Sequence, residues 1–175
     1  MAILYLGATA RPARERRWDT HAMPSNRFYS KLSMTMPDSW LKATGRLNIP
    51  VYRLSGGRLM NKVGTAPVLL LTSTGRRSGQ KRTAPVVYLK DAERYVVIGS
   101  NAGNVRTPAW SYNLQANPEA EIEIGRDRKL VRARVAEGEE RAELWRKVNE
   151  MYEGFDDYDA NTPMRKIAVF VLDPR

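Results

Sequence analysis

The feature that most limits the fold of this chain is a series of short strand-like runs separated by turns and not by helices. Residues 68–72 and 83–89 are rich in Val, Leu and Thr, and a third run at 95–99 follows the tight turn 90–93. Such runs, bounded by glycine and polar residues, predict three strands of an antiparallel meander. Because strands and helices do not alternate here, a doubly wound parallel sheet is disfavoured.

The later part of the chain adds helices and further strands. Apolar periodicity and turn residues predict strands at 119–124, 130–135 and 167–172, helices at 108–116 and 138–151, and an aromatic, acidic loop at 152–159. Thr107 suits the N-cap of the first helix, and Pro108 suits its first position. The whole pattern predicts an α+β fold, a mostly antiparallel split β-barrel with a few helices.

The N-terminal part differs from the rest. Residues 1–36 lack periodicity and predict a flexible extension, so the domain is expected to be a single one over 37–175. Asp38 or Ser39 suits a helix N-cap, and Gly45 and Pro50 should break any long helix. An imperfect apolar stripe follows the cap: Trp40, Leu41, Leu47, Val51 and Leu54. We favour a helix packed on the barrel, with a basic amphipathic segment on a membrane surface as the alternative.

Composition excludes several kinds of chemistry. The chain has no cysteine, and its one histidine, His21, lies in a basic N-terminal stretch. Thiolate sites, a Ser–His–Asp triad and a histidine metal site are therefore not expected, and we predict no metal. No run is apolar enough to span a bilayer, and the charges follow the first apolar residues instead of preceding them, so we expect a cytoplasmic protein.

The charge balance favours an anionic partner. The formal net charge is +10, and the first 60 residues hold ten Lys and Arg against Glu15, Asp19 and Asp38. Solubility alone could account for this excess, and so could a peripheral contact of the basic N-terminal part with the inner face of the membrane. A nucleic-acid-binding barrel is a less favoured alternative, since aromatic residues do not alternate with the basic ones as a stacking surface requires.

Two loops are suited to bind a ligand. The turn 75–82 holds four cations and two glycines, which suits phosphate or carboxylate, although an ordinary solvated hairpin turn is almost as well supported. Its glycine spacing is not that of a P-loop. The loop 100–106 leads into a helix on which Trp110, Asn113, Leu114 and Asn117 share one face, as a planar heterocycle would require. The alternative for that face is a capped helix with satisfied amides. A Rossmann glycine motif is absent.

With these segments named, the chain from Pro67 to Arg175 resembles the deazaflavin-dependent nitroreductase family. The resemblance rests on residues 70–80, on 108–118 and on the closing Asp173-Pro174-Arg175. These are split-barrel proteins that use coenzyme F420. The resemblance implies an oxidoreductase that transfers a hydride from reduced F420 to an apolar small-molecule acceptor, a quinone or a nitroaromatic. An FMN-binding split-barrel oxidoreductase is the alternative.

The resemblance also implies a cofactor site. The phosphate and carboxylate tail of the coenzyme would be held by the basic turn, through Arg76, Arg77, Ser78, Gly79 and Arg82. The ring would be bordered by Pro85, Val86, Val87, Gly99, Ser100, Ala109, Trp110 and Asn113. Asn101 stands where a family member has lysine, so a cation near the coenzyme is lost here or is supplied by Arg106.

The acceptor site follows from the same resemblance. Tyr152, Phe155 and Tyr158 would shape the acceptor pocket, with surface packing as the alternative for all three. The reaction needs no protein nucleophile, because the cofactor carries the hydride. It does need a proton, for which Tyr158 is the preferred donor, ahead of Ser100, Tyr152 and water.

Overall fold

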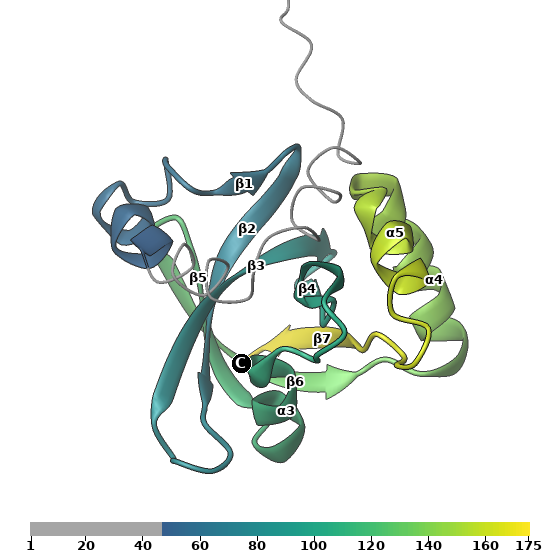
Figure 1. Cartoon of the computed structure of the whole chain (residues 1–175). Helices are drawn as coiled ribbons and strands as arrows, with labels where there is room; N and C mark the ends of the chain where they lie inside the picture. Colours follow the sequence, from purple (N-terminus) through teal and green to yellow (C-terminus); the bar gives the residue numbers. More distant parts are fainter. Residues whose placement is uncertain (1–46) are drawn as a thin grey trace, which may run out of the picture.

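Antiparallel strands form the body of the protein in residues 47–175, the part of the chain that the computed structural model describes (Figure 1). The strands are β1 (Lys62–Val63), β2 (Ala66–Thr74), β3 (Lys81–Asp91), β4 (Arg94–Ile98), β5 (Glu119–Ile124), β6 (Asp127–Val135) and β7 (Val169–Pro174). The helices are a segment at 47–54, a 3-10 turn η1 (Asn101–Gly103), α3 (Ala109–Ala116), α4 (Gly138–Met151) and α5 (Gly154–Ala160). The predicted extension over 1–36 lies outside the described residues.

The sheet closes into a barrel because β2 pairs on both of its edges. The strand order is β1-β2-β3-β4-β7-β6-β5, and β5 returns to pair with β2. At the centre of β2, Leu71 lies opposite Ala84 of β3 and opposite Ile122 of β5. The predicted meander β2-β3-β4 and the predicted antiparallel split barrel are confirmed.

The buried apolar side chains form two clusters, one inside the barrel and one outside it, and the same strands contribute residues to both. Because successive side chains of a strand point to opposite faces, Val86 of β3 points into the barrel and Val87 points out. The inner cluster is completed by Trp110 and Leu114 of α3. The outer cluster packs β4 and β7 against α4 and α5, which lie on one flank of the barrel (Figure 1).

Two local predictions need correction. The segment 152–159, predicted as a loop, contains helix α5, since Phe155 and Tyr158 lie three residues apart and bury the same face. Asp156 and Asp157 in its first turn also suit the positive end of a helix. Helix α3 begins one residue later than predicted, and its N-cap is the extended Pro108, not Thr107.

The segment 47–54 contacts the barrel by a face that differs from the predicted apolar stripe. Tyr52 is buried, and its hydroxyl accepts a hydrogen bond from the Gly125 N–H at 2.9 Å. Arg53 forms an ion pair with the buried Glu123. The pair is needed because burying the Glu123 carboxylate without a cation would cost several kcal/mol. Leu47 and Leu54 are 70% and 88% exposed, so these two residues of the stripe do not pack on the barrel, and Trp40 and Leu41 lie outside the described residues. The helix also continues through Pro50.

An ion-pair network around Asp91 joins the β3–β4 turn to α4 and predicts loss of stability in acid. The Asp91 carboxylate accepts from Lys147 Nζ at 2.9 Å and from Arg94 Nε at 3.0 Å. The bond from Lys147, followed by those from Arg94, lowers the pKa of Asp91 below its ordinary 3.8. The folded state therefore binds this proton less readily than the unfolded chain, so the stabilisation is complete near neutral pH and is lost as pH falls through the folded pKa.

We expect Asp91→Asn to reduce the free energy of unfolding at neutral pH by about 1 kcal/mol and to flatten its decline between about pH 5 and pH 3. Urea unfolding followed by circular dichroism over this pH range measures both effects. Glu150→Gln, which breaks an exposed pair with Arg146 on α4, is the control and should change little. A variant curve parallel to the wild-type curve would contradict the assignment.

Candidate functional site

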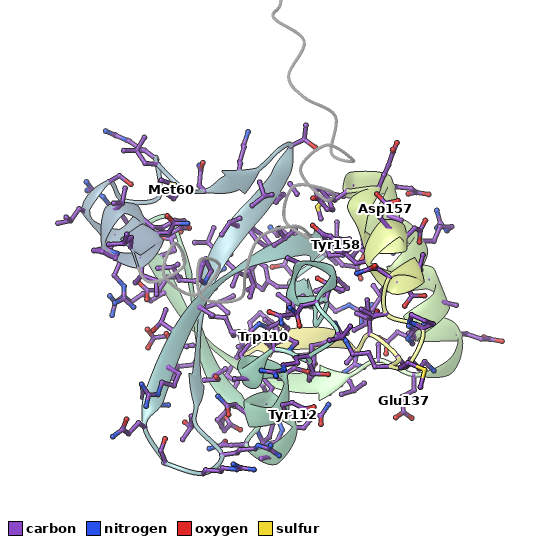
Figure 2. The ribbon with its side chains drawn as sticks, in the orientation of Figure 1. Met60, Trp110, Tyr112, Glu137, Asp157 and Tyr158 are labelled. Carbon is purple, nitrogen blue, oxygen red and sulfur yellow. The ribbon has the colours of Figure 1, made fainter. Side chains whose placement is uncertain are left out.

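A cleft of about 290 Å³ lies between β3, the loop that follows β4, the start of α3 and helix α5. Figure 2 labels two of its lining residues, Trp110 on α3 and Tyr158 on α5. Nine of the predicted site residues line it: Pro85, Val86, Val87, Ser100, Asn101, Trp110, Tyr152, Phe155 and Tyr158. Three segments far apart in the sequence thus meet at one cavity.

The walls of the cleft are mainly apolar and include flat surfaces. Pro85 and Val87 come from the outer face of β3, and Trp110 comes from the first turn of α3. Trp110 is held at an angle of 61° against Phe170, with ring centroids 5.6 Å apart, and is only 9% exposed. Apolar walls fixed by the core in this way suit a planar ligand more than a flexible one.

The aromatic wall carries two hydroxyl groups. Tyr152, Phe155 and Tyr158 are all buried and meet edge to face or at a tilt. The hydroxyls of Tyr152 and Tyr158 lie 3.2 Å apart, within hydrogen-bonding distance. Burial, followed by the bond to Tyr158, raises the pKa of Tyr152 well above its ordinary value, so this phenol stays protonated at neutral pH. Two phenol hydroxyls therefore lie side by side at the wall of the cleft.

The loop after β4 has an unusual backbone and is held by a half-buried arginine. Asn101 and Ala102 both have a φ of 53°, which L-residues other than glycine seldom adopt. Arg165 donates to the carbonyl oxygens of Gly99, Ser100 and Asn104 at 3.0, 2.6 and 2.8 Å. Asn161 Nδ2 donates to the Gly103 carbonyl at 2.9 Å. Arg165 was not predicted as a site residue, because no local pattern in the sequence distinguishes it from a surface cation.

The basic turn lies outside the lining of the cleft. Its backbone closes through the Gly79 N–H to the Gly75 carbonyl at 2.8 Å, with Gly79 at a φ of 68°. The guanidinium of Arg76 lies 4.5 Å from the centre of the Tyr112 ring. The predicted residues Arg76, Arg77, Ser78, Gly79 and Arg82 are all absent from the cleft wall. Within residues 47–175, no ion pair neutralises the cations of this turn: Arg76, Arg77, Lys81 and Arg82.

Asn113 has a different role from the one predicted for it. Its Oδ1 accepts from the Arg76 N–H at 3.1 Å, and its Nδ2 donates to Ser73 Oγ at 3.2 Å. It therefore joins α3 to the basic turn and does not face the cleft. The remaining predicted cofactor-site residues, Gly99, Arg106 and Ala109, are also absent from the lining, which instead includes Val63, Ile98, Ala102 and Pro108.

A second hollow of about 220 Å³ lies between the ends of β3, β4, β5 and β6. Tyr88, Tyr95 and two isoleucines border it, and Lys129 Nζ donates to the Tyr95 hydroxyl at 2.9 Å. It contains none of the predicted site residues and no convergence of separate loops. The cleft beside α5 is therefore the candidate site.

The protein is a split barrel with an aromatic cleft on its flank and a basic turn that forms no ion pair with the described residues. A family model described as F420H(2)-dependent quinone reductase matches residues 43–174, and the chain belongs to this family. It is an oxidoreductase that uses coenzyme F420, and the FMN alternative is not supported. No helix within 47–175 is long and apolar enough to cross a membrane.

Individual relatives agree with this family. A Mycobacterium tuberculosis protein named F420H(2)-dependent quinone reductase is 37% identical over 134 residues, which cover 74% of this chain and 89% of that protein. A solved structure of an F420-H2-dependent reductase is 33% identical, with a TM-score of 0.57 over 61% of this chain and 94% of its own. A further solved structure, described only as a domain-swapped dimer, is 29% identical, with a TM-score of 0.59 over 79% of this chain and all of its own.

Proposed function

We propose that the cleft binds the deazaflavin ring of coenzyme F420 and a quinone acceptor, and that the basic turn holds the anionic tail of the coenzyme. The observation that carries this proposal is the meeting of β3, the loop after β4 and the aromatic residues of α4–α5 at one cavity. Each of these segments is assigned to the site independently by the family resemblance. A site assembled from three distant segments is unlike a chance surface hollow.

The residues present fit the two parts of this coenzyme. Pro85 and Val87 form one apolar wall and Trp110 another, which suits a flat ring system. The tail carries phosphate and carboxylate groups, and the turn beside β3 offers Arg76, Arg77 and Arg82 without competing carboxylates among the described residues. Guanidinium groups bind such oxyanions through paired, charge-assisted hydrogen bonds.

The chain's own residues would position the acceptor and supply a proton. Reduced F420, when bound, supplies a hydride. Reduction of a quinone to a hydroquinone takes up one hydride and one proton, so a donor must reach the acceptor oxygen. Tyr158 would donate this proton and regain one from solvent, while the Tyr152 hydroxyl, 3.2 Å away, would hold the Tyr158 hydroxyl in place by a hydrogen bond. Ser100, which also lines the cleft, is the alternative donor.

The family name favours a quinone over a nitroaromatic as the small-molecule acceptor. The Phe155 ring and its tyrosine neighbours offer edges and faces for an aromatic acceptor. The cytoplasmic location stays a prediction. Contact of the basic N-terminal part with a membrane also stays a prediction, since residues 1–46 lie outside the described residues. A dimer of this chain is suggested only by the relative described as a domain-swapped dimer.

We expect the oxidised deazaflavin coenzyme to bind this protein at least about tenfold more tightly than FMN. Parallel titrations followed by fluorescence or calorimetry measure both dissociation constants, with NADP as a third ligand. Reduction of a soluble quinone by reduced F420 in the same preparation tests the reaction. FMN binding as tight as that of the deazaflavin would overturn the cofactor assignment, and coenzyme binding without quinone reduction would overturn the acceptor assignment.

A further inference from the structure

Arg165 lies in the segment between α5 and β7. Its guanidinium group donates hydrogen bonds to backbone carbonyl groups and not to a carboxylate. It forms no ion pair with any described residue, and three carbonyl groups of the loop after β4 surround its guanidinium. Burial lowers its pKa, but an arginine keeps its proton in a protein. A half-buried cation carries a desolvation cost, and here three hydrogen bonds to a single loop offset it.

The positions of these carbonyls set the directions of two N–H groups. None of the described peptide bonds is cis, and in a trans peptide the carbonyl and the following N–H point in opposite directions. The Gly99 and Ser100 carbonyls point at Arg165, so the N–H groups of Ser100 and Asn101 point away from it. Both residues line the cleft. In contrast, the N–H groups of Gly103 and Asn104 bond within the loop, to the carbonyls of Ser100 and Asn101.

We propose that Arg165 is a positioning residue that turns two peptide planes so that the N–H groups of Ser100 and Asn101 face the cleft and donate to the polar edge of the deazaflavin ring. This rests on the proposed function. The loop needs such a restraint, because the positive φ values of Asn101 and Ala102 are costly for residues other than glycine. A positive charge behind the carbonyls also polarises each peptide, which strengthens the N–H groups as donors.

The geometry requires the guanidinium group and not merely its charge. Nη1 donates to the Gly99 carbonyl oxygen, and Nη2 donates to those of Ser100 and Asn104. The planar guanidinium group therefore bonds three carbonyls at once. A lysine ammonium is a single point on a flexible stem and cannot reproduce this arrangement. Arg165→Lys therefore keeps the charge and removes the alignment.

The first test uses the wild-type protein. Amide hydrogen exchange, resolved by NMR, should slow at least about tenfold at Ser100 and Asn101 when oxidised F420 saturates the protein. The N–H groups of Gly103 and Asn104, already bonded within the loop, should change much less. Unchanged exchange at Ser100 and Asn101 in a protein that binds the coenzyme overturns this inference and leaves the proposed function intact. Failure of the wild-type protein to bind the coenzyme would overturn both this inference and the proposed function.

The second test compares two arginines. Arg165→Lys should weaken coenzyme binding about tenfold, as expected for two poorly aligned hydrogen bonds, with the quinone KM unchanged. Arg141→Lys is the control, because Arg141 also donates to one backbone carbonyl, that of Ile167, but does not touch the loop. Millimolar guanidinium should restore part of the binding to Arg165→Ala. Equal coenzyme affinity in the wild-type protein and Arg165→Lys would contradict the proposal. If the variants do not fold, the hydrogen-exchange measurement on the wild-type protein decides whether the proposal holds.

Discussion

Tyr158→Phe is expected to lower kcat/KM for quinone reduction by about 100-fold and to leave the dissociation constant of the coenzyme unchanged. The substitution keeps the ring that packs on Phe155 and removes only the hydroxyl group. That hydroxyl lies in the cleft and 3.2 Å from the hydroxyl of Tyr152. If it protonates the acceptor oxygen, its loss affects the chemical step. Steady-state kinetics and a coenzyme titration on the same variant separate the two effects.

The matched variants of this experiment distinguish the possible roles. Tyr152→Phe should lower kcat/KM less than Tyr158→Phe does, because the Tyr152 hydroxyl acts only through Tyr158 and a water molecule can take its place. Tyr88→Phe removes a phenol hydroxyl at the second hollow and should leave the kinetics as in wild type. A Tyr158→Phe loss of only about tenfold that falls on KM would assign the hydroxyl to acceptor orientation. Wild-type kinetics in all three would exclude the aromatic wall from the reaction.

Replacing Arg76 and Arg77 together by alanine is expected to weaken coenzyme binding by at least about 100-fold, since each charge-assisted contact contributes roughly 1.5–3 kcal/mol. The effect should be larger at about 50 mM salt than at about 300 mM, because the lost contacts are exposed and screened. The backbone N–H of residue 76 remains in the variant and can still donate to Asn113 Oδ1, so α3 keeps its contact with the turn. The measurement is a coenzyme titration at both salt concentrations.

The control for this pair removes equal charge elsewhere. Arg58 and Arg126 are exposed and form no ion pair with another described residue, so their double alanine variant changes the net charge by the same amount. It should bind the coenzyme nearly as wild type does. If both double variants lose the same affinity, the turn contributes only to the overall positive field of the protein. If neither loses affinity, the basic turn is an ordinary solvated hairpin.

Local pattern was sufficient for most of the barrel. The runs at 68–72, 83–89 and 95–99 predicted β2, β3 and β4, since alternation and turn chemistry are properties of neighbouring residues. The segment around α5 was harder, because its acidic residues suggested solvent while Phe155 and Tyr158 find buried partners only in the tertiary structure. The same holds for the segment 47–54, where the buried Glu123 selects the Arg53 face over the apolar one.

For the site, the sequence by itself determined which segments carry suitable chemistry: the strand 85–87, the loop after β4, the basic turn and the aromatic residues of 152–158. Only the tertiary structure decided which side chains meet. It turned Asn113 toward the basic turn, because Ser73 and the Arg76 N–H satisfy its amide there. It also brought Arg165 to Gly99, 66 residues away in the chain. Contacts between distant residues depend on strand register and helix docking, which no local pattern of residues specifies.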